Sequence, residues 1–290
     1  MSDQNVGKVP TKKILEKSPL AGITVPILII LVGALIVFGV TKMLSTGKDH
    51  RDLVDELNSK TFGNRWVAAY ELSKFLASKR IPQEDIPWVI ENLSQVYFES
   101  VDSRTRNFVV LALGSMGNPL ALPVLNKALE DQDPQVQFNA VSSLGNLTTT
   151  ENIEWGKIEA LLQQEKDPGL RQVALLSLAA HKRPNLEELA LPLLQSSERN
   201  LRHAAAIVLI SRKRPEVIPV LEEILNLSYD VAKAGELNGA QVEGLKVNVL
   251  ENIEKSNWNA LVQLVAKVEA NDPNIKVSTK AKQVLKVLKN

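Results

Sequence analysis

The chain has 290 residues, with 34 lysines and arginines against 33 aspartates and glutamates, three histidines and no cysteine. The absence of cysteine excludes a disulfide scaffold, a zinc ribbon, an iron–sulfur site and a thiol nucleophile, and the histidines are too scattered for a histidine-rich metal site. A net charge of +1 gives no global attraction to nucleic acid or to an anionic membrane, so an electrostatic partner requires a local patch.

A membrane anchor is predicted near the amino terminus. Residues 20–40 carry no charged side chain, and a helix of that length spans about 30 Å, the thickness of a bilayer hydrocarbon core. A soluble helix this long would need a polar face, and a cleaved signal peptide would have a shorter apolar run and a small-residue cleavage site. We therefore expect a flexible tail at 1–18, an uncleaved transmembrane helix at 19–41 and a juxtamembrane linker at 42–49.

The basic residues beside the predicted span do not decide its orientation, because both flanks carry a similar number of them. A short tail rich in lysine resists translocation, whereas a large carboxy-terminal domain crosses a membrane largely regardless of its charge. We expect a single-pass protein of the bacterial inner membrane whose carboxy-terminal domain is periplasmic. The cytoplasmic side stays open as the alternative for that domain.

An internal repeat extends over residues 50–290. In five places an oxygen-bearing residue is followed four positions later by a basic or amide residue, then by a small or apolar residue and by leucine. The oxygen-bearing residues are Thr61, Asp102, Asp133, Asp167 and Glu198, and the basic or amide residues are Arg65, Arg106, Gln137, Arg171 and Arg202. Because oxygen-bearing side chains cap helix starts, and proline directly follows two of these aspartates, the pattern predicts a helix beginning in each unit.

A second series of segments carries a proline inside an apolar pattern of helical spacing, at Pro87, Pro123, Pro192 and Pro219. Each unit is therefore predicted as a first helix, a turn and a second helix. The expected units begin near residues 50, 81, 118, 150, 183, 214 and 257.

These motifs resemble HEAT repeats of the bacterial HEAT-like type, whose profile also describes phycobilin lyases. The resemblance is strongest over 81–213. The sixth unit lacks the motif in its second helix, and in the seventh, where Asp272 is the expected helix start, Ala281 and Leu285 fall two positions late. The resemblance implies an all-α fold, a right-handed α-solenoid of about six to seven helical hairpins at 50–290, and a protein-binding role.

The repeated arginines and acids have a structural and a functional interpretation. HEAT-like stacks commonly pair an acid at one helix start with a base on the next helix, which predicts a ladder between repeats. Contact of the arginines with a ligand is the alternative.

A candidate partner-binding surface lies on the second helix of the units. The positions directly after the basic or amide residue, and four later, hold several large side chains, namely Trp66, Tyr70, Phe138, Leu176, His203 and Ile207. Exposed together, they would form an apolar stripe suited to a partner helix or an extended peptide, whereas packing in the core is the alternative. We expect His203 to be a surface residue without a metal-binding or catalytic role.

A candidate basic edge lies in the turns that follow the second helices. Its residues are Lys79, Arg80, Lys182, Arg183, Arg212, Lys213 and Arg214. Cations near helix C-termini are stabilised by the helix dipole, which explains them without a partner. An anionic partner along this edge is the alternative.

No motif for catalysis, for a cofactor or for a metal is found in the sequence. We interpret the protein as a membrane-anchored, noncatalytic scaffold that engages another envelope or membrane protein through its solenoid surface. The alternatives are a transient assembly factor for a membrane complex and a lyase-like HEAT enzyme. No nucleic-acid partner is expected, because aromatic residues are not interleaved with the basic ones. The oligomeric state stays undetermined.

Overall fold

The computed structural model describes residues 49–58, 65–78, 81–148, 151–164, 166–230 and 237–289. The chain divides into two compact units, Met1–Arg51 and Asp52–Asn290, and the repeats belong to the second. The predicted tail and membrane span, and the predicted linker apart from Asp49, lie outside the described residues. Among the helices that are described, none has the combined length and apolarity that crossing a bilayer requires.

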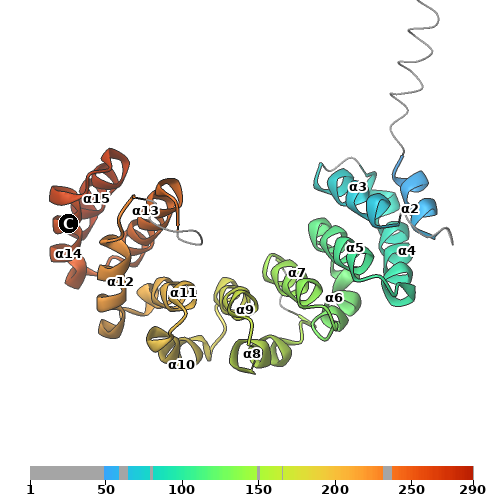
Figure 1. Cartoon of the computed structure of the whole chain (residues 1–290), viewed down its shortest axis with the longest axis horizontal. Coiled ribbons are helices and arrows are strands. Elements are labelled where there is room, and N and C mark those ends of the chain that lie inside the picture. Colours follow the sequence, from blue (N-terminus) through green and yellow to red (C-terminus); the bar gives the residue numbers. More distant parts are fainter. Residues whose placement is uncertain are drawn as a thin grey trace, which may run out of the picture. The chain divides into compact units, whose positions relative to one another are not determined.

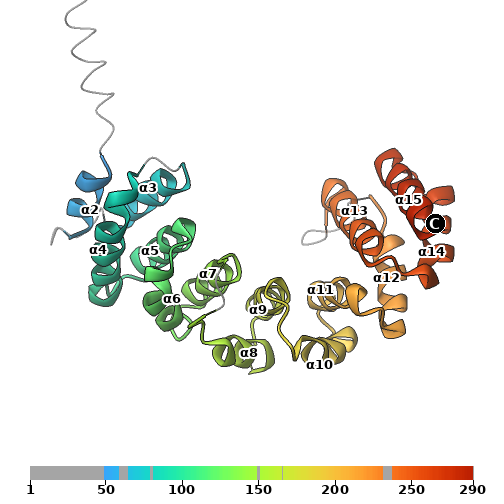
Figure 2. The same cartoon turned by 180° about the vertical axis from the view of Figure 1, so that it is seen from behind.

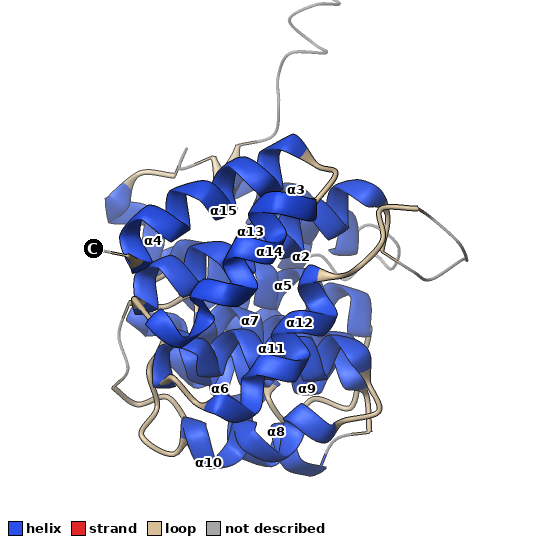
Figure 3. Ribbon diagram, turned by 90° about the vertical axis from the view of Figure 1, so that its left-hand side faces the viewer, coloured by secondary structure: helices blue, strands red, loops and turns tan. Residues whose placement is uncertain are grey.

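All regular structure in the described residues is helical (Figure 3). The first helices of the units are α2 (His50–Asn58), α4 (Ile86–Glu99), α6 (Leu122–Ala128), α8 (Trp155–Gln164), α10 (Leu186–Ala190), α12 (Ile218–Leu225) and α14 (Val262–Asn271). The second helices are α3 (Arg65–Ala77), α5 (Ser103–Met116), α7 (Pro134–Gly145), α9 (Pro168–Ala180), α11 (Arg199–Leu209), α13 (Gly239–Ser256) and α15 (Ile275–Leu288). The alternation of paired helices confirms the predicted helical hairpins.

Within the second unit, the second helices stack on one another in chain order. Contacts join α3 to α5, α5 to α7, α7 to α9, α9 to α11 and α13 to α15, while the short 3₁₀ helix η4 (Ile210–Arg212) joins α11 to α13. Figures 1 and 2 show the second helices of the units, the odd-numbered helices from α3 to α15, as a row on the inner side of the stack. The even-numbered helices from α4 to α14 form a row outside it. We call these the inner row and the outer row.

Helices α5, α7, α9 and α11 of the inner row begin where the repeat motif predicts. Asp102, Asp133 and Asp167 each accept a hydrogen bond from a backbone N–H of the first helical turn, so each is an N-cap. Glu198 occupies the same position before α11, but its side chain makes no capping hydrogen bond. Thr61 lies outside the described residues. Because a cap satisfies backbone donors within three residues of itself, these starts follow from local sequence.

The outer-row prolines lie at helix starts and not inside helices, which corrects the sequence prediction. Pro87, Pro123 and Pro219 are the second residues of α4, α6 and α12, and each of these helices follows a 3₁₀ turn. Pro192 holds the same position in the 3₁₀ helix that continues α10. Proline lacks an N–H, and the first turn of a helix is the place where that donor has no intrahelical partner.

The last inner-row helix begins two residues later than predicted. Asn274, and not Asp272, is the N-cap of α15, because its side chain accepts hydrogen bonds from the backbone N–H groups of Lys276 and Val277. Counted from Asn274, Ala281 and Leu285 occupy the same positions as their counterparts in the other repeats. The late motif therefore marks a regular helix whose start is displaced.

One continuous apolar core runs through the second unit, from Leu53 to Leu288. Small residues let neighbouring inner-row helices approach closely within it. A Cβ atom added to Gly114 of α5 would lie 2.0 Å from Ser143 Oγ of α7, and one added to Gly145 would lie 3.0 Å from Ser177 Oγ of α9. Glycine is therefore required for the close contact at Gly114.

Candidate partner-binding site

Three aromatic side chains meet on the first two described helices of the inner row. The ring centres of Trp66 and Tyr70 of α3 lie 6.3 and 5.3 Å from that of Phe108 of α5. Lys74 Nζ lies 4.0 Å from the Tyr70 ring centre, and the Arg104 guanidinium carbon lies 5.8 Å from that of Trp66. Tyr70 is 39% exposed and Trp66 and Phe108 are half-buried, so this aromatic platform is accessible from solvent.

An amide pair lies directly beside the platform. Asn139 of α7 donates a hydrogen bond from Nδ2 to Asn107 Oδ1 of α5. Asn107 is half-buried and adjoins Phe108 in the sequence, whereas Asn139 is 8% exposed. The pair therefore links two inner-row helices next to the aromatic rings.

The charge of the inner row is one-sided only in its middle part, because α3 contains Glu71 and α13 contains three glutamates. Helices α5, α7, α9 and α11 contain no aspartate or glutamate, whereas α5, α9 and α11 contain arginines. The side chain of Arg104 is 69% exposed and makes a 3.3 Å ion pair with the N-cap Asp102. We define the inner strip as the set of Trp66, Tyr70, Arg104, Asn107, Phe108 and Asn139.

The structure separates the predicted apolar stripe into distinct environments. Trp66 and Tyr70 lie together on the platform, and Leu176 of α9 is 44% exposed. Phe138 and Ile207 are half-buried and pack against the core. The other four residues of the inner strip are absent from the predicted stripe, because their role depends on which side chains neighbouring helices bring against them; they are Arg104, Asn107, Phe108 and Asn139.

His203 is buried, which corrects the expectation of a surface position. It is 3% exposed, and its Nε2 lies 2.9 Å from Glu223 Oε1 of α12. Arg202 donates to the same carboxylate from Nε at 3.0 Å and from a terminal guanidinium nitrogen at 2.7 Å. Hydrogen bonds from Arg202 and His203 lower the pKa of Glu223 to about 2, and burial lowers the pKa of His203 below its usual value although Glu223 opposes this.

We expect the stability of the protein to fall between pH 7.5 and pH 5.5 partly through His203. Because its pKa is lower in the folded state, the unfolded chain binds the proton first as the pH drops through about 6.5, and stability is lost below that pH. Replacing His203 by glutamine removes this contribution. Denaturant unfolding of the full chain should show a smaller loss of stability across this pH range in His203→Gln than in the wild type. If the free energy of unfolding falls equally with pH in both proteins, His203 does not make this contribution.

Ion pairs of the repeated arginines join the second repeat to the third and the fifth to the sixth, although not through the predicted acids. Arg171, at the equivalent position of α9, instead donates from Nε to the Leu162 carbonyl of its own unit at 2.9 Å. Arg106 of α5 makes a two-pronged contact with Asp131, in the loop before α7, at 2.7 and 2.8 Å. Arg202 of α11 makes the equivalent contact with Glu223 of α12. The acids thus come from the following unit's outer helix or the loop after it, because the N-cap aspartates hydrogen-bond to backbone N–H groups of their own helices.

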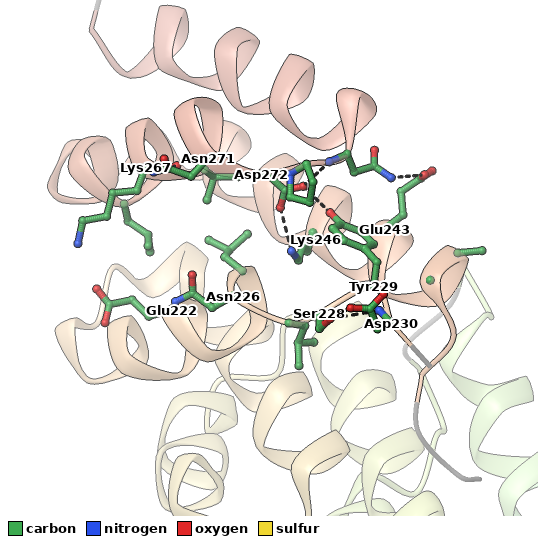
Figure 4. A pocket seen from close by; sticks show the side chains of 18 residues that line it. Glu222, Asn226, Ser228, Tyr229, Asp230, Glu243, Lys246, Lys267, Asn271 and Asp272 are labelled. Atoms are coloured by element: carbon green, nitrogen blue, oxygen red, sulfur yellow. Dashed lines mark hydrogen bonds and ion pairs between the residues drawn. The ribbon is translucent and has the colours of Figure 1, made fainter. Parts of the chain in front are cut away.

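A cavity of about 980 Å³ opens among α12, α13 and α14 (Figure 4). A buried ion pair lies at one side of it, with Lys246 Nζ 2.8 Å from Asp272 Oδ2 and each side chain only 3% exposed. The Tyr229 hydroxyl donates to Asp272 Oδ1 at 2.6 Å, and Lys246 Nζ lies 4.3 Å from the Tyr229 ring centre. This cluster is absent from the sequence prediction, and the displaced motif of the seventh unit is the one sequence signal for it.

The same cluster occurs earlier in the stack, between α4, α5 and the loop before α7. There the Tyr97 hydroxyl donates to Asp131 at 2.9 Å, and Arg106 takes the place of Lys246. Burial alone would raise the pKa of Asp131, but hydrogen bonds from Arg106, the Asp133 amide and Tyr97 together hold that pKa below its usual value. A tyrosine–carboxylate–cation cluster is therefore a repeated packing element, and its presence beside the cavity does not indicate catalysis.

The basic edge is largely engaged in contacts within the protein. Arg214 pairs with Glu187 at 3.2 Å and Glu216 at 2.7 Å, and Lys213 Nζ donates to the Asn257 carbonyl at the end of α13. Arg183 lies 4.9 Å from the Trp155 ring centre. Lys182 and Arg212 are exposed, and Lys79 and Arg80 lie outside the described residues.

No group of three or more histidine, aspartate or glutamate side chains within the described ranges is arranged to hold a metal ion.

Comparison with known proteins gives a family and a fold. The family described as HEAT repeats matches residues 90–155 and 157–237, together more than half of the chain. YibA of Escherichia coli is similar in structure, with a TM-score of 0.56 and 18% identity over 84% of this chain and 83% of that one. The complex of CpcE and CpcF of phycocyanin lyase from Nostoc sp. PCC7120 has a TM-score of 0.53 and 17% identity, over 83% and 94% of the two chains. No curated protein matches the sequence. At these identities the structural likeness shows the fold alone.

Proposed function

Because the chain belongs to the HEAT-repeat proteins, whose stacked helix pairs generally mediate protein–protein interactions, we propose that it is a noncatalytic scaffold tethered to a membrane. In this proposal residues 20–40 form the anchor, and the inner strip engages another membrane or envelope protein on the periplasmic side of a bacterial inner membrane. The anchor would raise the effective concentration of the repeats toward a partner in the same membrane, so a modest interface suffices.

The observation that carries the proposal is the accessible aromatic platform. Tryptophan and tyrosine are enriched among the residues that dominate binding energy at protein interfaces, because they combine a large apolar area with few rotatable bonds. Trp66 and Tyr70 meet Phe108 on the inner row, where Tyr70 remains 39% exposed. The clusters around Asp131 and Asp272 support a noncatalytic role, since both are explained by packing between repeats.

We expect Trp66→Ala to weaken capture of the partner strongly while leaving the fold intact. Removing a dominant interface side chain costs at least about 2 kcal/mol, which is about thirtyfold in affinity. The measurement is quantitative affinity capture of the full chain from gently solubilised membranes. Phe98→Ala is the matched control, because Phe98 is 62% exposed on α4 in the outer row. Equal capture by wild type and Trp66→Ala would contradict the assignment, and substoichiometric, stage-dependent capture would favour a transient assembly factor.

We expect residues 20–40 to hold the protein in the membrane fraction. Replacing both Ile30 and Leu31 by arginine places two charges at the centre of the segment, each costing about 3 kcal/mol of insertion free energy. The double variant should move to the soluble fraction under alkaline extraction, whereas Ile30→Leu should not. Retention of the arginine variant in the membrane would show that the anchor lies elsewhere.

A further inference from the structure

The amide pair of the inner strip has hydrogen-bonding capacity that the described part of the chain leaves unused. Its one hydrogen bond runs from Asn139 Nδ2 to Asn107 Oδ1, so Asn107 Nδ2 and Asn139 Oδ1 have no partner there. Together they present N–H donors and a carbonyl acceptor. A peptide unit offers the complementary C=O and N–H.

This complementarity distinguishes between the two forms of partner that suit an apolar surface. A helix satisfies its backbone N–H and C=O groups internally and has none to offer to the amide pair. An extended segment exposes both groups. The amide pair therefore favours an extended chain.

The surrounding charge defines the composition of that segment. Arg104 is exposed beside Trp66, and Lys74 is exposed beside Tyr70. Arg104 pairs with the N-cap Asp102 at 3.3 Å, but its side chain is still 69% exposed. Helices α5 and α7 contain no acid, and Glu71 is the one acid of α3. Because a guanidinium has five N–H donors, Arg104 can bind a partner's carboxylate in addition to Asp102, and the exposed Lys74 ammonium can pair with a second one.

We propose that the inner strip binds an extended segment of the partner that carries acidic residues and an aliphatic or proline residue, an inference that rests on the proposed scaffold function. The aromatic platform takes the apolar side chain, Arg104 and Lys74 take carboxylates, and the amide pair takes one peptide unit of the backbone. Because adjacent helices are spaced by about 8–10 Å, the distance from α3 to α7 corresponds to about six extended residues.

A random 12-residue peptide library displayed on phage tests this proposal against the full chain in detergent. We expect the selected peptides to be rich in aspartate and glutamate. For a synthetic peptide of the best sequence, Trp66→Ala, Arg104→Glu and Asn107→Leu should each weaken binding at least tenfold, as should N-methylation of the backbone amide that pairs with Asn139. Affinity should also fall between 50 and 300 mM salt, because exposed charge pairs are screened.

The matched controls are outer-row substitutions of the same chemistry. Phe98→Ala removes an exposed aromatic side chain from α4, and Lys127→Glu reverses a charge that is 58% exposed on α6, so both should leave affinity unchanged within twofold. Selection of basic peptides, or of amphipathic helical peptides indifferent to Asn107→Leu, would overturn the proposal. If no peptide is selected while capture of an intact partner still requires Trp66, the extended segment is refuted and the scaffold function stands. If no partner is captured either, the scaffold function itself fails.

Discussion

Replacing Asp272 by asparagine is expected to lower the free energy of unfolding by about 3–5 kcal/mol, because it leaves the Lys246 ammonium buried without its counter-charge. Asparagine keeps an oxygen that can accept from the Tyr229 hydroxyl and from the Asn274 backbone N–H. The substitution therefore isolates the effect of charge from the effect of lost hydrogen bonds. Denaturant unfolding of the full chain at neutral pH measures it.

A second substitution makes this prediction specific. Adding Lys246→Met to Asp272→Asn removes the unpaired buried ammonium and should recover most of the lost stability. Replacing both members of a buried ion pair often changes the free energy of unfolding little. The matched control is Glu243→Ala, whose ion-pair partner Lys276 has a side chain that is 70% exposed, and it should have a much smaller effect. An equal loss in Asp272→Asn and in the double variant would show that the buried charge is not the cause.

The contribution of Asp272 should also depend on pH. Burial would raise the pKa of Asp272, but hydrogen bonds from Lys246, Tyr229 and the Asn274 amide lower it below its usual value. A carboxyl with a lowered pKa stabilises the folded state above its unfolded pKa of about 3.9, and this contribution is lost as the pH falls through the folded value. The difference in the free energy of unfolding between the wild type and Asp272→Asn should therefore become smaller only at acidic pH.

Replacing Gly114 by alanine is expected to destabilise the protein by about 1–3 kcal/mol, although alanine is the better helix former by about 1 kcal/mol. The added Cβ would lie 2.0 Å from Ser143 Oγ and 2.4 Å from Ser143 Cβ, so α5 and α7 would have to separate. Both helices belong to the continuous core, and their separation would disturb packing on both sides. The steric term therefore exceeds the gain in helix propensity.

The origin of the effect at Gly114 can be tested with two further substitutions. Ser143→Gly in the Gly114→Ala background removes the clashing atoms and should restore part of the stability, giving a favourable coupling in the double-mutant cycle. Gly244→Ala in α13 is the control, because no atom lies within 4 Å of the Cβ it would add, and it should stabilise the protein by up to about 1 kcal/mol. If Gly114→Ala stabilises the protein, α5 and α7 can separate without a loss of packing energy, which would contradict the prediction.

Local sequence determines where several inner-row helices begin. Asp102, Asp133 and Asp167 cap backbone N–H groups two or three residues ahead, so their role is contained in a short stretch of chain. The prolines of the outer row lie at helix starts and not inside helices, a distinction that the sequence leaves open because a proline in an apolar pattern fits either place. The repeat itself was also readable, since each hairpin needs an apolar face for its neighbours.

Tertiary structure alone decided which of the repeated positions face a neighbour and which face solvent. His203 and Trp66 follow equivalent arginines in the sequence, yet His203 is buried against Glu223 whereas Trp66 meets Phe108 on an accessible platform. The pairing of Asn107 with Asn139, and of Lys246 with Asp272, joins residues from different repeats. A repeat motif defines position within a hairpin, but these contacts depend on how closely successive hairpins stack, which the side chains of both hairpins determine together.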